Sequence, residues 1–199
     1  MFSRYAFQPR ACALTVALVM LVVALPAAQT NNAPVKFTAF AVNLDSTTAP
    51  TGAGTVEIAV NRWSTAAERE KLLTTFVEQG PEKLLDVLQG MPSTGYIRTP
   101  NSLAYDLRFA NRMPADEGGD RIVLATDRYI SFWEASNRPR SIDYPFTLIE
   151  LRIKPNGEGE GKMSIATKII PDKRNNAIVL ENYGTQPVML TQVKREPSR

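Results

Sequence analysis

The chain of 199 residues contains no histidine and only one cysteine, Cys12. Without histidine it has no imidazole for a Ser-His-Asp triad, for a general base near neutral pH or for the usual binding of transition metals. Cys12 lies in a segment that we expect to be removed, so the remaining chain offers no thiolate nucleophile, no cysteine-bound zinc and no disulfide. We therefore expect neither a metal centre nor a cofactor.

The first residues follow the order typical of a secretory signal peptide. Within residues 1–28, Arg4 and Arg10 are the only charged residues. An apolar run of 15 residues extends from Ala11 to Leu25, and the small pair Ala27-Ala28 marks the cleavage region. A membrane-spanning helix needs about 20 apolar residues, so this run is too short for a comfortable permanent anchor. The sequence predicts a signal peptide over residues 1–28 and an exported product, periplasmic or secreted, without a stable membrane span.

The charge of the remaining chain is nearly balanced. Removal of residues 1–28 leaves 21 of the 23 basic residues against 20 acidic ones, a net charge of +1. Nucleic-acid-binding proteins carry a clear basic excess, so we expect no nucleic-acid partner. Residues 29–199 are long enough for one mostly β globular domain with a buried core, and residues 29–34 form a polar tether at its start.

Apolar residues that alternate with polar ones predict strands along most of this domain. The strand-like segments are 35–44, 55–63, 103–109, 122–126, 146–154, 162–170, 177–182 and 187–194. Short turns separate the last four of them and predict a C-terminal β-meander. The glycines and glutamates of residues 157–161 predict a flexible, acidic hairpin turn.

The hydrophobic period changes after residue 64 and predicts one helical hairpin near residues 65–90. Thr65 and Glu68 fit a capping box, and Gly80 is a natural helix end. A second helix is expected from Pro81 to Gly90. We predict an α+β fold, in which an antiparallel sheet or open barrel of about seven to nine strands carries this helix pair on one side or at one end.

The connection from Arg128 to Pro145 is the candidate functional surface. It has 18 residues, and loops beyond about 15 residues tend to be functional or disordered, whereas its aromatic residues argue against disorder. Guanidinium groups bind oxyanions in pairs of hydrogen bonds, and aromatic rings stack on sugar or peptide faces. The predicted binding residues are Trp133, Arg138, Arg140 and Tyr144. The predicted partner is an anionic small molecule, a glycan or an envelope protein. In the alternative interpretation, residues 129–133 are another core strand and the arginines are ion-paired with neighbouring carboxylates.

Carboxylates are the remaining route to catalysis, because a glycosidase needs only two Asp or Glu residues at a suitable separation. The candidates on or beside strands are Asp106, Asp127, Glu134, Asp143 and Glu150. Each is explained more simply as an exposed strand residue that faces a nearby arginine, for which the candidates are Arg108, Arg128, Arg140 and Arg152. A carboxylate-based hydrolase acting on glycans is therefore kept as the alternative function.

Four segments of the chain are distinctive: VNRWST at 60–65, GYIRTP at 95–100, RSIDYPF at 140–146 and GKMSIATK at 161–168. In these segments the chain resembles a group of exported bacterial proteins with no assigned activity. The resemblance spans most of residues 29–199 and implies a bacterial, exported setting without residue roles. We expect an exported, non-enzymatic β-rich domain that binds a ligand or another protein, or that has a structural role in the envelope.

Overall fold

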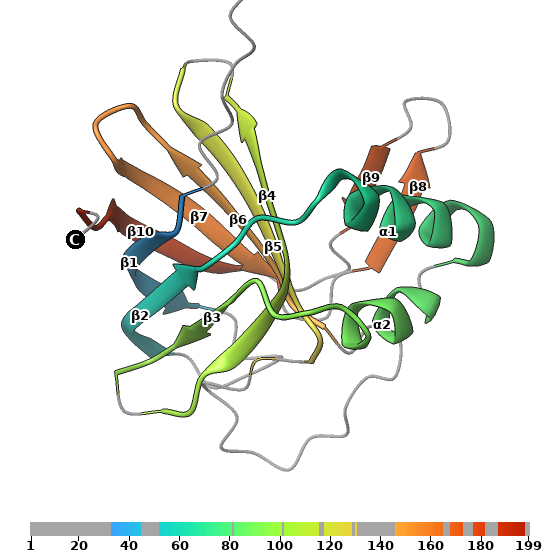
Figure 1. The fold of residues 1–199 in the computed structure, drawn as a ribbon. Coiled ribbons are helices and arrows are strands. Elements are labelled where there is room, and N and C mark those ends of the chain that lie inside the picture. The colour runs from blue at the N-terminus through green and yellow to red at the C-terminus, as the bar shows by residue number, and fades with distance from the viewer. Residues whose placement is uncertain are drawn as a thin grey trace, which may run out of the picture. The chain divides into compact units, whose positions relative to one another are not determined.

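Alternation of apolar and polar residues builds a closed barrel of eight antiparallel strands (Figure 1). The computed structural model describes residues 33–44, 52–80, 82–100, 102–115, 118–128, 130, 146–164, 168–172, 177–181 and 187–197. The chain divides into two units, Met1–Asn31 and Asn32–Arg199, and all of the described residues lie in the second unit.

The barrel strands follow one another around the wall in the order β1-β10-β7-β6-β5-β4-β3-β2. Their bounds are β1 Val35–Asn43, β2 Gly52–Val60, β3 Gly95–Arg98, β4 Tyr105–Pro114, β5 Asp120–Thr126, β6 Leu148–Ile153, β7 Glu158–Ser164 and β10 Val188–Arg195. The predicted β-rich α+β fold is confirmed, and the closed barrel is more specific than the predicted sheet or open barrel. Closure depends on β1, which pairs with β2 on one side and with β10 on the other.

The predicted C-terminal meander is wrong in one place. A single strand was expected over residues 162–170, but β7 ends at Ser164 and a separate strand, β8 (Lys168–Asp172), begins after it. β8 pairs with β9 (Ala177–Glu181) in a two-stranded sheet of its own, whereas β7 pairs with β10. The β8–β9 hairpin is thus an insertion between two neighbouring barrel strands, which a succession of short turns does not reveal.

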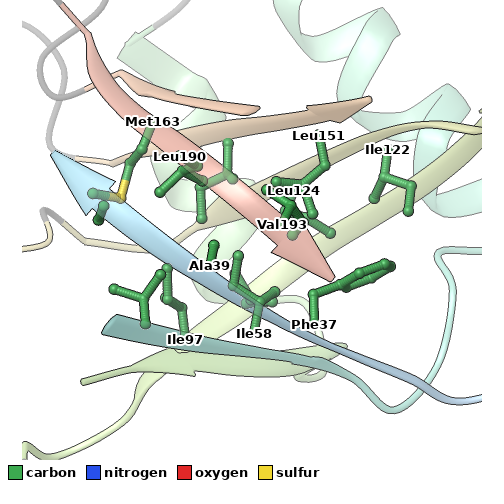
Figure 2. Packing of buried hydrophobic residues seen from close by; sticks show 14 of the residues in the cluster. Phe37, Ala39, Ile58, Ile97, Ile122, Leu124, Leu151, Met163, Leu190 and Val193 are labelled. Atoms are coloured by element: carbon green, nitrogen blue, oxygen red, sulfur yellow. The ribbon is translucent and has the colours of Figure 1, made fainter. Parts of the chain in front are cut away.

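The barrel interior is filled by apolar side chains. On β5, Ile122 and Leu124 point inward and are fully buried, whereas Arg121, the residue before Ile122, points outward and is exposed. Figure 2 shows side chains from different strands converging on the same space, among them Phe37 of β1 and Leu151 of β6. An eight-stranded barrel has an interior just wide enough for such side chains.

Two glycines let β7 pass close to β6. Gly159 and Gly161 lie on the inward side of β7, opposite Val193 and Leu190 of β10. A methyl group at Gly159 would collide with the backbone carbonyl of Arg152, and one at Gly161 would collide with Glu150 and Leu151. The interpretation of residues 157–161 as a flexible turn is therefore wrong from Glu158 onward: the turn is made by residues 154–157, and Gly159 and Gly161 belong to the wall.

The helical hairpin is confirmed and packs on the outside of the barrel. α1 (Ala66–Gln79) begins with the predicted capping box of Thr65 and Glu68 and ends at Gly80, and α2 (Glu82–Gln89) follows. The helices bury their apolar stripes in a second cluster with Ala125 and Phe146; the helical members are Leu72, Phe76, Leu84 and Leu88. Because Ala125 follows the inward-facing Leu124, the helices cover the outer face of the wall at the end of β5.

Candidate functional site

The described strands leave no room for a ligand inside the barrel. Inward-pointing side chains from strands all around the barrel are completely buried, including Phe37 of β1, Ile97 of β3, Ile149 of β6 and Met163 of β7. Small barrels use their interior either for packed side chains or for one small ligand, and this barrel uses it for packing. Binding chemistry in the described part of the chain is therefore found on the outer wall and at the barrel ends.

The charged outer wall of β5, β6 and β7 is centred on Glu150. Arg121 donates two hydrogen bonds to the Glu150 carboxylate, from Nε at 3.0 Å and from Nη2 at 3.1 Å, and Arg152 donates a third from Nε at 3.2 Å. In the register of β6 and β7, Glu150 lies opposite Lys162, and Arg152 lies opposite Glu160. Charges of both signs thus alternate along and across the three strands.

Glu150 stays ionised because of these arginines. Partial burial raises the pKa of its carboxyl group, but the hydrogen bonds and positive charges of Arg121 and Arg152 outweigh burial and hold the pKa below its ordinary value. A carboxylate held in this way accepts hydrogen bonds and does not donate a proton near neutral pH. Its contribution to the site is to position two guanidinium groups.

A second cluster lies on the wall of β1, β2 and β3. The hydroxyl of Tyr96 donates to Glu57 at 2.5 Å, and Arg98 Nη2 and Lys36 Nζ approach the same carboxylate at 3.2 and 3.8 Å. The hydrogen bond from Tyr96 is the main reason that the pKa of Glu57 is lowered, and the same bond raises the pKa of the Tyr96 hydroxyl. The Arg98 guanidinium also lies over the Tyr96 ring, 5.3 Å from its centre.

A third cluster closes one end of the barrel. The carboxylate of Asp120 accepts hydrogen bonds from Arg112 Nε at 2.7 Å, from Arg112 Nη2 at 2.6 Å and from Arg195 Nη2 at 2.5 Å. Arg195 lies on β10, which is separated from β5 by two other strands, so this ion triad reaches across the barrel. The Arg195 guanidinium is also 5.9 Å from the ring centre of the buried Phe37.

The predicted binding residues Trp133, Arg138, Arg140 and Tyr144 all lie outside the described residues. The described residues on either side of this connection are hydrogen-bonded to each other. The backbone N–H of Thr147 donates to Thr126 Oγ1 at 2.9 Å, and the N–H of Ile130 donates to Thr147 Oγ1 at 3.2 Å. Thr126, Thr147 and Ile130 are buried, so the connection leaves and re-enters the barrel at one point.

Arginines and acids gather beside that point. Arg108 binds Asp127 through Nε at 2.8 Å and Asp106 through Nη2 at 3.3 Å, and it also donates to the backbone carbonyl of Met91. Arg128 is 61% exposed and lies over the ring of Tyr105, 5.6 Å from its centre. An exposed guanidinium on an aromatic ring has the chemistry that the sequence predicts for this surface, and the four predicted residues themselves stay untested.

The pairing of carboxylates with arginines is confirmed for the three candidates that are described. Asp106 and Asp127 share Arg108, and Glu150 is bound by Arg121 and Arg152. The other two, Glu134 and Asp143, lie outside the described residues. Sequence reasoning missed Arg121, since its link to Glu150 depends on the register that places residues 121 and 150 on adjacent strands.

Within the described ranges, no group of three or more His, Cys, Asp or Glu side chains is placed to hold a metal ion. Of the helices in the same ranges, none is both long and apolar enough to cross a membrane.

Comparisons with known proteins do not identify the chain. It matches no family model, no curated protein and no solved structure. The resemblance to exported bacterial proteins therefore stays a prediction, and the function has to be argued from the site alone.

Proposed function

We propose that this chain is an exported, non-enzymatic binding protein whose partner contacts the outside of the barrel. The observation that carries the proposal is the filled interior, where fully buried apolar side chains occupy the space that a ligand-carrying barrel keeps open. Two exposed arginines supply hydrogen-bond donors on the outer surface: Arg152, which is bound to Glu150, and Arg128, which lies over the ring of Tyr105. Such donors suit the expected partners: an anionic small molecule, a glycan or an envelope protein.

A carboxylate-based hydrolase acting on glycans is the alternative. Such an enzyme needs one carboxyl group whose pKa is raised, so that the group is still protonated near neutral pH. The pKa of Glu150 is lowered instead, and Asp106 and Asp127 are both engaged by Arg108. These contacts support binding over hydrolysis.

One experiment separates the two functions. The protein recovered after export is mixed with acidic peptides and with oligosaccharides of uronic acids; binding is followed by NMR shifts of its amides, and turnover by mass spectrometry of the ligand. We expect concentration-dependent shifts and an unchanged ligand mass. Cleavage of an oligosaccharide that is lost in Glu150→Gln or in Asp127→Asn would contradict the proposal and favour the hydrolase.

A further inference from the structure

A shallow depression of about 130 Å³ lies on the outer wall over β6, β7 and β10. Four charged side chains from two neighbouring rungs surround it, Glu150 with Lys162 and Arg152 with Glu160. The backbone of Gly161 lies between the rungs, and Met189 of β10 completes the lining. This depression is outside the region that the sequence predicts to be functional.

The lining carries two positive and two negative charges, and its two cations have hydrogen-bond donors that Glu150 does not use. The Glu150 carboxylate is already bound by Arg121 and Arg152. Arg152 uses only Nε for this contact, and its side chain is 70% exposed. Within the described residues its two terminal nitrogens form no hydrogen bond. Lys162 is exposed, and within the described residues its ammonium group takes part in no ion pair. Two cationic donors therefore border the depression. Of its two carboxylates, Glu150 is engaged by arginines, and Glu160 takes part in no ion pair with another described residue.

An apolar strip continues from the same place. Met189 lies opposite Lys162 on one side and opposite Val42 of β1 on the other. Phe40, two residues before Val42, is 40% exposed, and Leu44, two residues after it, is 69% exposed. Side chains two apart on a strand point to the same face, so Phe40, Val42 and Leu44 extend the apolar surface along the outer wall.

The size of the depression limits what it can hold. Pockets for whole small molecules have volumes of about 300–1,000 Å³, so a space of about 130 Å³ fits one carboxylate with its attached carbon atoms. The remainder of the partner must lie across the wall, where the neighbouring surface is apolar. A chain that has both an acidic and an apolar side chain matches this arrangement better than a hydroxyl-rich sugar, which would need hydrogen-bond partners along the strip.

We propose that this surface, the depression together with the strip of Met189, Val42 and Phe40, binds an extended acidic segment of another protein. The proposal rests on the function proposed above, that a partner contacts the outside of the barrel. From Lys162 to Val42 is two strand spacings, or about 10 Å. Side chains on one face of an extended chain are two or four residues apart, about 7 or 13 Å. The recognised segment therefore has an Asp or Glu four residues from a large apolar residue, the shortest same-face spacing that covers the distance.

The probe is an eight-residue peptide, blocked at both ends, with one glutamate and one leucine four positions apart, so that both side chains lie on one face of the extended chain. Amide shifts are recorded for the exported protein on addition of this peptide, of the same peptide with glutamine for glutamate, and of a glucuronate oligosaccharide. We expect the first peptide to shift the amides of Gly161, Lys162 and Met189. We expect the glutamine peptide to bind about tenfold more weakly, the difference of one charged hydrogen bond.

Variants test the same surface from the side of the protein. Arg152→Gln combined with Lys162→Gln should lower the affinity for the glutamate peptide by about tenfold or more. Lys71→Gln combined with Lys83→Gln removes the same two charges from exposed positions on α1 and α2 and should leave the affinity unchanged. An equal loss in both variants would mean that only net charge matters and would overturn the site.

The failures of the two proposals are distinguishable. If the oligosaccharide shifts these amides and the peptides do not, the protein partner is refuted, while binding on the outer wall stands. If the peptides shift amides only on another face, this surface is refuted and the proposed function again stands. Hydrolysis of a probe would instead contradict the proposed function.

Discussion

The ion triad at the barrel end gives the sharpest stability prediction, for Asp120→Asn. The substitution keeps the shape of the side chain but leaves Arg112 and Arg195 facing each other without the carboxylate that binds both. The Asp120 side chain is 14% exposed, whereas the two arginine side chains are 29% and 31% exposed. Removal of one member of a fully buried ion pair costs about 3–5 kcal/mol.

The partial exposure of the arginines reduces this value, because water replaces some of their lost contacts. We expect Asp120→Asn to lower the free energy of unfolding by about 1.5–3 kcal/mol. In a domain of this size that corresponds to a fall in melting temperature of about 4–10 °C. The measurement is thermal unfolding followed by circular dichroism at pH 7. Asp86→Asn is the control, since Asp86 and its partner Lys83 are both more than half exposed, and it should change the stability by less than about 0.5 kcal/mol.

The pH dependence tests the cause. Burial raises the pKa of Asp120, but hydrogen bonds from Arg112 and Arg195 outweigh burial, and the pKa in the folded protein lies below its ordinary value. A group of this kind stabilises the fold above its unfolded pKa, and the stabilisation is lost as the pH falls through the folded pKa. The difference between the wild type and Asp120→Asn should therefore be full at pH 6–7 and shrink below about pH 4. A difference that is absent at pH 7, or that does not change down to pH 3, would refute the reasoning.

Three further predictions test the wall, the helix start and the processing. In chemical denaturation, Gly159→Ala should lower the free energy of unfolding by about 1–3 kcal/mol, because the added methyl group meets a backbone carbonyl of β6. Gly54→Ala is the control: no atom lies within 4 Å of the added methyl group, so the substitution should be nearly neutral. Thr65→Ala should cost about 1 kcal/mol by removing the helix cap, whereas Thr74→Ala on the exposed side of α1 should cost less, and equal melting temperatures would contradict this. The intact mass of the exported protein should correspond to a chain that begins near Gln29, and a mature form that retains Cys12 would contradict the predicted cleavage.

Features that are local in sequence could be predicted from the sequence. The capping box joins residues three apart, and the helix that follows depends on the apolar spacing up to Phe76. The strand β1 could also be predicted, because its alternation is visible in consecutive residues. Its predicted end is one residue too late, since the last ladder pair is that of Asn43 with Gly52. In these segments the hydrophobic period and the terminal hydrogen bonds predict the same element, so residues close in sequence are enough to predict it.

Features that depend on distant pairing could not be predicted. Closure of the barrel requires β1 to pair with β10, where Phe37 lies opposite Arg195. No local sequence pattern predicts this pairing. Gly159 and Gly161 were mistaken for a turn because the inward side of β7 has no apolar side chains of its own before Met163. The space that they leave is taken by Val193 and Leu190, which lie opposite them on β10, so the missing pattern is supplied by another strand.

The same separation of inside from outside makes the binding proposal testable without loss of the fold. Stability depends on the apolar interior and on the triad around Asp120, which ties β4 and β5 to β10. The side chains of Arg152 and Lys162 contribute little to it, because exposed ion pairs are worth about 1 kcal/mol at most. Substitutions on the outer wall can therefore remove a partner while the barrel stays folded. Substitutions at Asp120 should weaken binding only through unfolding, so the two sets of variants assign each effect to its own part of the molecule.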